Sequence, residues 1–152
     1  MISDRRYSRF TMAIPGSFLR RIGKLNVPLY RITRGRIGGR VGRAPVLLLT
    51  TTGRRSGEPR TSPVLFLPDG ERLLVIGSNA GNDRPPAWAL NLTANPDAEV
   101  QVRADRRQVR ARVAEGEERD ELWRKMNEQY SGFDDYRNRT KRDIRLFVLE
   151  PR

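Results

Sequence analysis

The segment Thr51–Arg60 combines a backbone and side chains that suit the binding of an anion. Two glycines let the chain turn with its amides exposed, and three arginines within seven residues supply guanidinium groups that match phosphate oxygens. These residues are Gly53, Gly57, Arg54, Arg55 and Arg60. A Walker-type phosphate loop is excluded, because its lysine and following hydroxyl residue are missing. Composition alone leaves two interpretations open, an anion site and a solvated hairpin turn.

Two further stretches carry side chains that could donate protons or line a pocket. Ser78–Gly81 is a small polar loop after an apolar run, where an ordinary strand end is the alternative interpretation. Aromatic rings stand at every third position in Tyr130, Phe133 and Tyr136. Such spacing is common in core helices, but the intervening Gly132 makes this stretch less apolar than a core helix, so a pocket wall stays open as an interpretation.

Residue usage limits the chemistry available to these side chains. The chain has 152 residues and contains no cysteine and no histidine. Disulfides, thiolate nucleophiles, imidazole bases and metal sites built on Cys or His are therefore excluded, so we expect no metal. The remaining options are hydroxyl, carboxylate, tyrosine and arginine chemistry, or chemistry supplied by a bound cofactor.

The charge distribution divides the chain into two unequal parts. The formal net charge is +12, from 30 basic and 18 acidic residues, which favours an anionic partner. Residues 1–43 contain 11 of the basic residues and one acid, whereas residues 44–152 are almost balanced. We therefore predict a basic arm over 1–43 and a globular domain over 44–152, an asymmetry that disfavours nucleic acid as the partner.

The arm shows the periodicity of an amphipathic helix. Its apolar side chains recur at spacings of four and three residues, with arginines and a lysine largely between them, and Pro28 is expected to kink or split the helix. The apolar positions are Phe18, Ile22, Leu25, Leu29 and Ile32. This stripe could pack on the protein's own core or lie on an anionic membrane surface. Gly35–Arg40 reads as a flexible basic linker that ends the arm.

The elements that must position the candidate residues are short strands and short helices. Extended runs are expected at Val46–Thr52, Pro59–Leu67, Arg72–Ser78 and Ile144–Leu149, with a hairpin from Val100 to Val113 that turns at Asp105-Arg106. Helices are expected at Pro86–Asn95, Glu115–Tyr130 and Phe133–Thr140, with Trp88 and Trp123 in the core. Because long helices do not alternate with the strands, the prediction is an α+β fold, a small antiparallel barrel that is closed or partly closed.

These motifs resemble the deazaflavin-dependent nitroreductase family over about residues 10–152, in the same order and at the same separations. The segments that carry the resemblance are Pro45–Arg60, Ser78–Gly81, Pro86–Pro96, Tyr130–Tyr136 and Phe147–Pro151. The resemblance implies a split β-barrel, which adds to the short flanking helices and the N-terminal amphipathic helix predicted above. It also implies binding of the 8-hydroxy-5-deazaflavin coenzyme F-420, whose phosphodiester and oligoglutamate tail are polyanionic.

The resemblance also assigns roles to individual residues. It implies that coenzyme phosphate and ring are bound by Arg54, Arg55, Ser56, Gly57, Arg60, Ser62, Pro63 and Val64. It places Ser78 and Asn79 near the ring and tail, and it makes Tyr130, Phe133 and Tyr136 the aromatic wall of the substrate pocket. Hydroxyl groups that could stabilise a developing oxyanion or donate a proton are those of Tyr130, Tyr136 and Ser78. Phe133 has no such hydroxyl and contributes apolar wall alone.

The expected activity is hydride transfer from the reduced coenzyme to an apolar two-electron acceptor such as a quinone or a nitroaromatic. Two rivals stay open, a flavin mononucleotide oxidoreductase on the same barrel and a non-enzymatic basic module that binds RNA or membrane. The longest uninterrupted apolar stretches, such as Val46–Leu49, are far too short for a signal peptide or a membrane span. We therefore expect a cytoplasmic protein, with peripheral contact to the inner membrane face through the arm.

Overall fold

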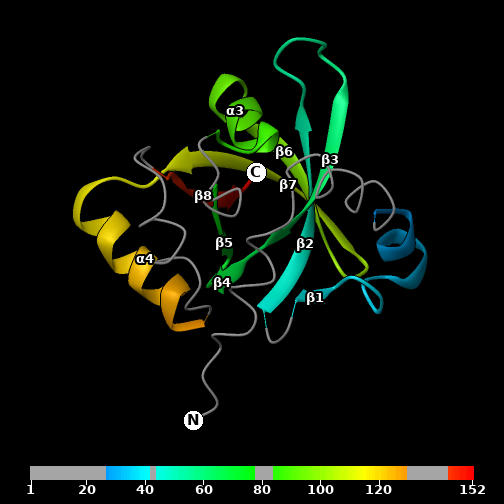
Figure 1. Ribbon diagram of the computed structural model, residues 1–152, viewed down its shortest axis with the longest axis horizontal. Coiled ribbons are helices and arrows are strands. Elements are labelled where there is room, and N and C mark those ends of the chain that lie inside the picture. The colour runs from blue at the N-terminus through cyan, green and yellow to red at the C-terminus, as the bar shows by residue number, and fades with distance from the viewer. Residues whose placement is uncertain (1–26, 42–43, 78–83, 130–143) are drawn as a thin grey trace.

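The scaffold is an antiparallel sheet that curls into a partly closed barrel (Figure 1). The computed structural model describes residues 27–41, 44–77, 84–129 and 144–152. Its strands are β1 (Arg40–Val41), β2 (Ala44–Thr52), β3 (Pro59–Leu65), β4 (Leu67–Asp69), β5 (Arg72–Ile76), β6 (Asp97–Val102), β7 (Asp105–Val113) and β8 (Leu146–Pro151). Its named helices are α3 (Ala87–Ala94) and α4 (Gly116–Gln129), and residues 27–33 are also helical. The predicted α+β antiparallel barrel is confirmed.

The strand order is β1-β2-β6-β7-β8-β5-β4, and β3 pairs with β2. All of these pairings are antiparallel, so neighbouring strands can be joined by tight turns. Hairpins whose turns lie within the described residues join β2 to β3, β4 to β5 and β6 to β7. The β2–β3 hairpin extends beyond the rest of the sheet, and its tip lies on the same side of the barrel as α3 (Figure 1).

The barrel interior is filled by alternating residues of the strands, because side chains at every second position point to the same face. Leu47 and Leu49 of β2 join Val100 of β6 and Phe147 of β8 in one buried cluster. Trp88 of α3 packs its ring edge-on against Phe147, with ring centres 5.8 Å apart. The predicted core position of Trp88 is confirmed, and α3 thus closes one end of the barrel.

The helix α4 covers the outer face of β5 and β8. Its residues Leu122, Trp123 and Met126 lie four or fewer positions apart, so they share one helix face, and all three are buried. They pack with Leu74 and Val148, which point outward from the barrel. Burying each large side chain contributes about 1.5–3 kcal/mol. The predicted helix is confirmed and begins one residue after the predicted Glu115, whereas its predicted last residue, Tyr130, lies outside the described residues. The core position of Trp123 is also confirmed.

Tyr30 attaches the helical residues 27–33 to the barrel. Its side chain is 1% exposed and packs with Val46 and Leu48 of β2. Its hydroxyl donates to the carbonyl of Val46 at 2.9 Å and accepts from the amide of Arg103 at 2.8 Å. This part of the arm therefore packs on the barrel through a tyrosine that lies outside the predicted apolar stripe.

The predicted stripe itself points away from the core where the structure describes it. Leu29 is 44% exposed and Ile32 is 79% exposed, whereas Phe18, Ile22 and Leu25 lie outside the described residues. Packing of the stripe on the core is thus wrong for Leu29 and Ile32. The physical reason is that Tyr30 occupies the core-facing position of this turn of helix, which rotates both side chains toward solvent.

The expected flexible linker Gly35–Arg40 is instead an ordered turn followed by a strand. The amide of Gly35 donates to the carbonyl of Tyr30 at 2.8 Å, which ends the helix. A side chain at Gly39 would lie 2.0 Å from the carbonyl oxygen of Gly35, so only glycine permits this close approach. Strand β1 then pairs Arg40 with Pro45 of β2.

Three predicted boundaries need correction. The run Pro59–Leu67 breaks at Phe66, whose side chain is buried and whose amide donates to the carbonyl of Pro45 at 3.1 Å, so β3 pairs with β2 and only β4 pairs with β5. The β6–β7 turn lies at Arg103-Ala104, because the Tyr30 hydroxyl holds the amide of Arg103, which has a left-handed φ of 55°. The last strand begins at Leu146 rather than Ile144, whose side chain packs in the α4 cluster.

Candidate active site

The turn between β2 and β3 (residues 53–58), which together with Arg60 we call the arginine turn, holds its shape through its own backbone. The amide of Gly53 donates to the carbonyl of Glu58 at 2.8 Å, and the amide of Gly57 donates to the carbonyl of Gly53 at 2.8 Å. A side chain at Gly53 would lie 2.6 Å from the hydroxyl oxygen of Ser56, and Gly57 has a φ of +71°. The left-handed φ of Gly57 favours glycine, and a side chain at Gly53 would displace the Ser56 hydroxyl, which agrees with the turn predicted from the sequence.

The turn presents positive charge to solvent without internal neutralisation. Arg54, Arg55 and Arg60 are all exposed, and among the ion pairs of the described residues none involves these three guanidinium groups. A side chain added at Gly57 would meet nothing within 4 Å, so the turn is open on that side. An exposed, ordered loop with three unpaired guanidinium groups suits a polyanionic ligand, and the residues present therefore fit the phosphate and tail of the implied coenzyme.

The predicted coenzyme residues that follow the turn lie on two faces of β3. Ser62 pairs with Leu49 and Val64 with Leu47, both of which point into the barrel, so Ser62, Val64 and Arg60 share the inner face. Pro63 points to the opposite face, beside the helical residues 27–33. The structure therefore brings together the turn, Arg60 and Ser62, places Val64 within the core cluster, and separates Pro63 from this group.

Asn91 is a polar residue at this site that sequence reasoning did not single out. It lies on α3, and its side chain contacts both the arginine turn and β2. One signal was available in the sequence, since asparagine is a poor helix former in the middle of a mostly apolar eight-residue helix. The pattern could not show what this side chain binds, because its partners are 37 and 40 positions away along the chain.

The remaining predicted site residues lie outside the described residues. These are Ser78, Asn79, Tyr130, Phe133 and Tyr136. The described residues that flank them in sequence are in contact, since the amide of Gly77 donates to the carbonyl of Arg145 at 2.9 Å. The chain therefore leaves the described barrel toward Ser78 and re-enters it after residue 143 at adjacent points.

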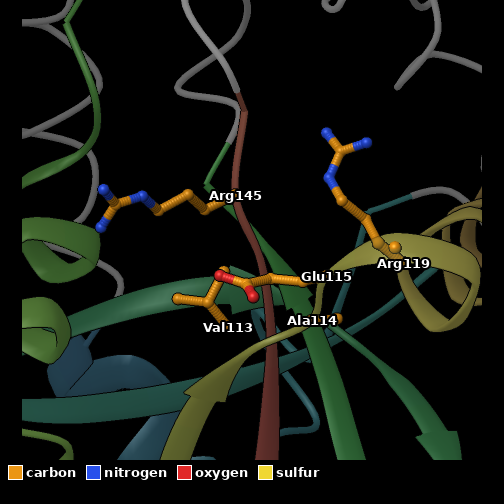
Figure 2. Close-up of a pocket in the computed structure, with 6 residues that line it drawn as sticks. Val113, Ala114, Glu115, Arg119 and Arg145 are labelled. Carbon is orange, nitrogen blue, oxygen red and sulfur yellow. The ribbon is translucent and has the colours of Figure 1, made fainter.

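A hollow of about 490 Å³ lies at the start of α4, away from the arginine turn. Its lining includes Glu115, Arg119 and Arg145, which are drawn in Figure 2. Both guanidinium groups already donate hydrogen bonds to the protein. Arg145 donates to the Thr93 hydroxyl at 2.9 Å, and Arg119 donates to the carbonyl of Ile144 at 2.9 Å. A negative charge at Glu115 also makes this hollow a poorer anion site than the turn.

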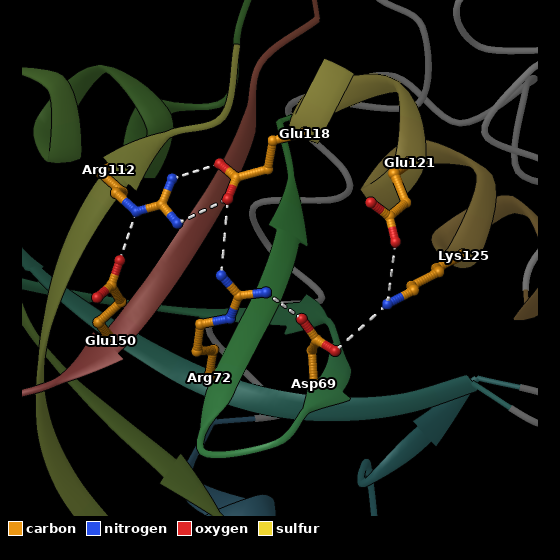
Figure 3. A network of polar contacts seen from close by, with 7 residues as sticks. All are labelled: Asp69, Arg72, Arg112, Glu118, Glu121, Lys125 and Glu150. Atoms are coloured by element: carbon orange, nitrogen blue, oxygen red, sulfur yellow. Dashed lines mark hydrogen bonds and ion pairs between the residues drawn. The ribbon is translucent and has the colours of Figure 1, made fainter. Parts of the chain in front are cut away.

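A chain of ion pairs joins the hairpin β4–β5, α4, β7 and β8 on the outside of the barrel (Figure 3). Arg72 hydrogen-bonds the carboxylate of Asp69, which holds the pKa of Asp69 below its usual value. Arg112 binds Glu118 with both terminal nitrogens and lowers the pKa of Glu118 in the same way. Shifted pKa values can mark catalytic groups, but here each has a paired charge as its main cause, so the cluster is structural.

Comparison with known proteins gives a consistent result. The family described as F420H(2)-dependent quinone reductase matches residues 22–151. An F420H(2)-dependent quinone reductase of Mycobacterium tuberculosis is 39% identical over 133 residues, covering 85% of this chain and 89% of that protein. A solved F420-H2 dependent reductase is 34% identical with a TM-score of 0.65, covering 70% of this chain and 94% of that one. The heme storage protein HutZ of Vibrio cholerae, at 21% identity and a TM-score of 0.53 over 84% of this chain and 90% of that one, shares the fold.

Proposed function

The chain belongs to the F420H(2)-dependent quinone reductase family, and from that premise we propose how its own residues support the reaction. It is an oxidoreductase that uses coenzyme F-420. Neither a flavin mononucleotide enzyme nor a non-enzymatic binding module is favoured beside this family assignment. A quinone is the acceptor that the family description names.

The reduced coenzyme supplies the hydride when it is bound, since the protein contains no redox-active cysteine or metal-binding histidine. The protein's own task is to hold an anionic coenzyme, to hold the acceptor against its ring, and to exclude water from the contact. An ordered site performs these tasks well, because positioning that is fixed in advance removes entropy cost from the reacting complex.

Coenzyme binding is assigned to the arginine turn. Arg54, Arg55 and Arg60 provide charge-assisted hydrogen bonds to phosphate and carboxylate oxygens, while Ser56 and Gly57 allow close approach of the backbone. Ser62 lies on the same face of β3 as Arg60, which supports the proposal that it contacts the ring. Val64 and Pro63 complete the proposed set. The single observation that carries this assignment is the cluster of three unpaired guanidinium groups on one ordered turn.

The acceptor side is assigned to the stretch with the aromatic rings and to the loop after Gly77. Tyr130 and Tyr136 are proposed to face the acceptor, with Phe133 as apolar wall. The hydroxyls of Tyr130, Tyr136 and Ser78 are the proposed proton or hydrogen-bond donors, and Asn79 is proposed to lie near the coenzyme tail. Support comes from the hydrogen bond between Gly77 and Arg145. Gly77 directly precedes Ser78, and Arg145 follows the segment 130–143 that contains the aromatic residues, so the two segments are attached to the barrel at neighbouring points.

Anaerobic oxidation of reduced coenzyme F-420 by a soluble quinone tests the function. We expect turnover that requires both compounds and saturates in each. Tyr130→Phe and Tyr136→Phe should lower kcat while leaving coenzyme binding largely intact, because each removes one hydroxyl from the acceptor side. Full turnover with reduced flavin mononucleotide in place of the deazaflavin would contradict the proposal.

We also propose that the protein works in the cytoplasm at the surface of an anionic membrane, where a quinone resides. Leu29, Ile32 and Ile37 are exposed apolar side chains, and Arg34 and Arg36 lie among them. Exposed apolar residues beside arginines are typical of segments that lie on anionic bilayers. The contact that we propose is peripheral. No helix within the described ranges is long and apolar enough to cross a membrane.

A further inference from the structure

We propose that Asn91 is a positioning residue for coenzyme binding, which acts by fixing the backbone of the arginine turn. The proposal rests on the proposed function of that turn. The side chain of Asn91 is 4% exposed and uses both ends of its amide. Its Oδ1 accepts the backbone amide of Arg54 at 3.1 Å, and its Nδ2 donates to the Thr51 hydroxyl at 3.1 Å.

The first contact reaches the turn from outside the hairpin. The hydrogen bonds within the hairpin define the shape of the turn. They do not attach the turn to the rest of the barrel, and residues 54–60 are exposed. A hairpin end that is held only by its own strands can swing as a unit. The bond from Asn91 to the Arg54 amide therefore fixes the direction in which the three guanidinium groups point relative to the barrel.

The second contact fixes Asn91 itself. Thr51 is buried on the inner face of β2, and its hydroxyl holds the amide group of Asn91 in one orientation. The neighbouring residues Trp88, Ala89 and Leu92 of α3 are buried in the barrel core. The helix is therefore held rigidly on the barrel, and the hydrogen bond from Asn91 holds the turn at a fixed position relative to the helix.

This arrangement gives Asn91 an effect on binding without requiring contact with the ligand. Arginines that are already oriented lose less conformational entropy when the anion binds. Removal of the Asn91 contact should therefore raise the Kd for coenzyme F-420, whereas kcat at saturating coenzyme and the KM for the quinone should change little.

The experiment compares four variants by titration with coenzyme F-420 and by steady-state kinetics. Asn91→Leu keeps a similar volume but removes both hydrogen bonds, and we expect its Kd to rise about tenfold or more. Thr51→Val removes only the hydroxyl that orients Asn91, so its Kd should rise by a smaller factor, and Thr51→Ser should restore it. Thr93→Val is the matched control, since Thr93 is on the same helix but bonds to Ala89 and Arg145. Its Kd should stay within twofold of the wild type.

A second comparison separates positioning from a general loss of stability. If Asn91 acts through the arginines, Asn91→Leu should raise the Kd less in an Arg55→Ala background than in the wild type. Equal factors in both backgrounds, or a wild-type Kd in Asn91→Leu, would overturn the inference. If Asn91→Leu does not fold, Thr51→Val and Thr51→Ser decide the question. A wild type that does not bind the coenzyme would instead overturn the proposed function, and the inference with it.

Discussion

At the scale of single residues, Tyr30 shows how one side chain can attach a charged arm to a neutral barrel. Its buried hydroxyl has backbone partners that include the carbonyl of Val46 and the amide of Arg103. In Tyr30→Phe the ring still packs, but both groups lose a partner, and we expect a loss of about 1–3 kcal/mol of unfolding free energy. Urea denaturation measures this, with Ile32→Ala as an exposed control that should change stability by less than about 0.5 kcal/mol. Equal stability of all three proteins would show that the hydroxyl contributes nothing.

The arginines of the turn should each contribute to coenzyme affinity. Arg55→Ala and Arg60→Ala each remove charge-assisted hydrogen bonds of about 1.5–3 kcal/mol, so we expect the Kd to rise by about 10- to 150-fold. Arg110→Ala on β7 removes the same charge from another exposed strand and should leave the Kd nearly unchanged. The measurement is a fluorescence titration at fixed salt. Unchanged Kd values for both turn variants would show that the turn is a solvated hairpin turn and not an anion site.

At the scale of elements, α4 is held to the barrel partly by carboxylates whose pKa values are lowered. A carboxylate with a lowered folded-state pKa stabilises the fold above its unfolded pKa, about 4, and this contribution disappears as the pH falls through the folded value. Glu118→Gln should therefore cost less than about 1 kcal/mol near neutral pH, because the pair is partly exposed and screened by solvent.

Urea denaturation at several pH values tests this expectation. The difference between wild type and Glu118→Gln should narrow as the pH falls from about 5 toward 2, since the wild-type carboxylate becomes protonated. Glu128→Gln, on the same helix, should follow the wild type across the range. A stability difference for Glu118→Gln that does not depend on pH would contradict the role of the ion pair.

The elements whose signals are local were predictable from the sequence. Pro86 and Asn95 flank α3 as expected, and the spacing of Leu122, Trp123 and Met126 located the buried face of α4. The two glycines of the arginine turn also predicted the position of that turn correctly. Contacts between distant parts of the chain had no such signal. The pairing of β2 with β6 and the hydrogen bonds of Tyr30 and Asn91 join residues that are far apart in sequence, and periodicity carries no information on which partners meet.

Boundaries failed where a tertiary contact overrode a local preference. Asp105-Arg106 has the composition of a turn, but the Tyr30 hydroxyl moves the turn to Arg103-Ala104. Leu29 and Ile32 have the spacing of a core stripe, but Tyr30 occupies the core position. In both cases a single buried residue determines the outcome.

At the scale of the whole molecule, the charge asymmetry should govern association with membranes. We expect the full chain to sediment with anionic vesicles at low salt and to be released at high salt, since each basic residue near the surface contributes about 1 kcal/mol. The double variant Arg34→Gln/Arg36→Gln should bind less, whereas Arg110→Gln/Arg124→Gln carries the same change in net charge and should bind like the wild type. An equal loss of vesicle binding in both double variants would show that net charge alone is responsible. A wild type that does not bind the vesicles would contradict the proposed membrane contact.

The central claim is that this barrel binds a deazaflavin coenzyme through the arginine turn. Parallel titrations of the full-length protein with coenzyme F-420 and with flavin mononucleotide test it most directly. We predict tighter binding of coenzyme F-420, with an affinity that falls as salt increases, because in the proposed mode its anionic groups bind Arg54, Arg55 and Arg60. Equal or tighter binding of flavin mononucleotide would contradict the claim.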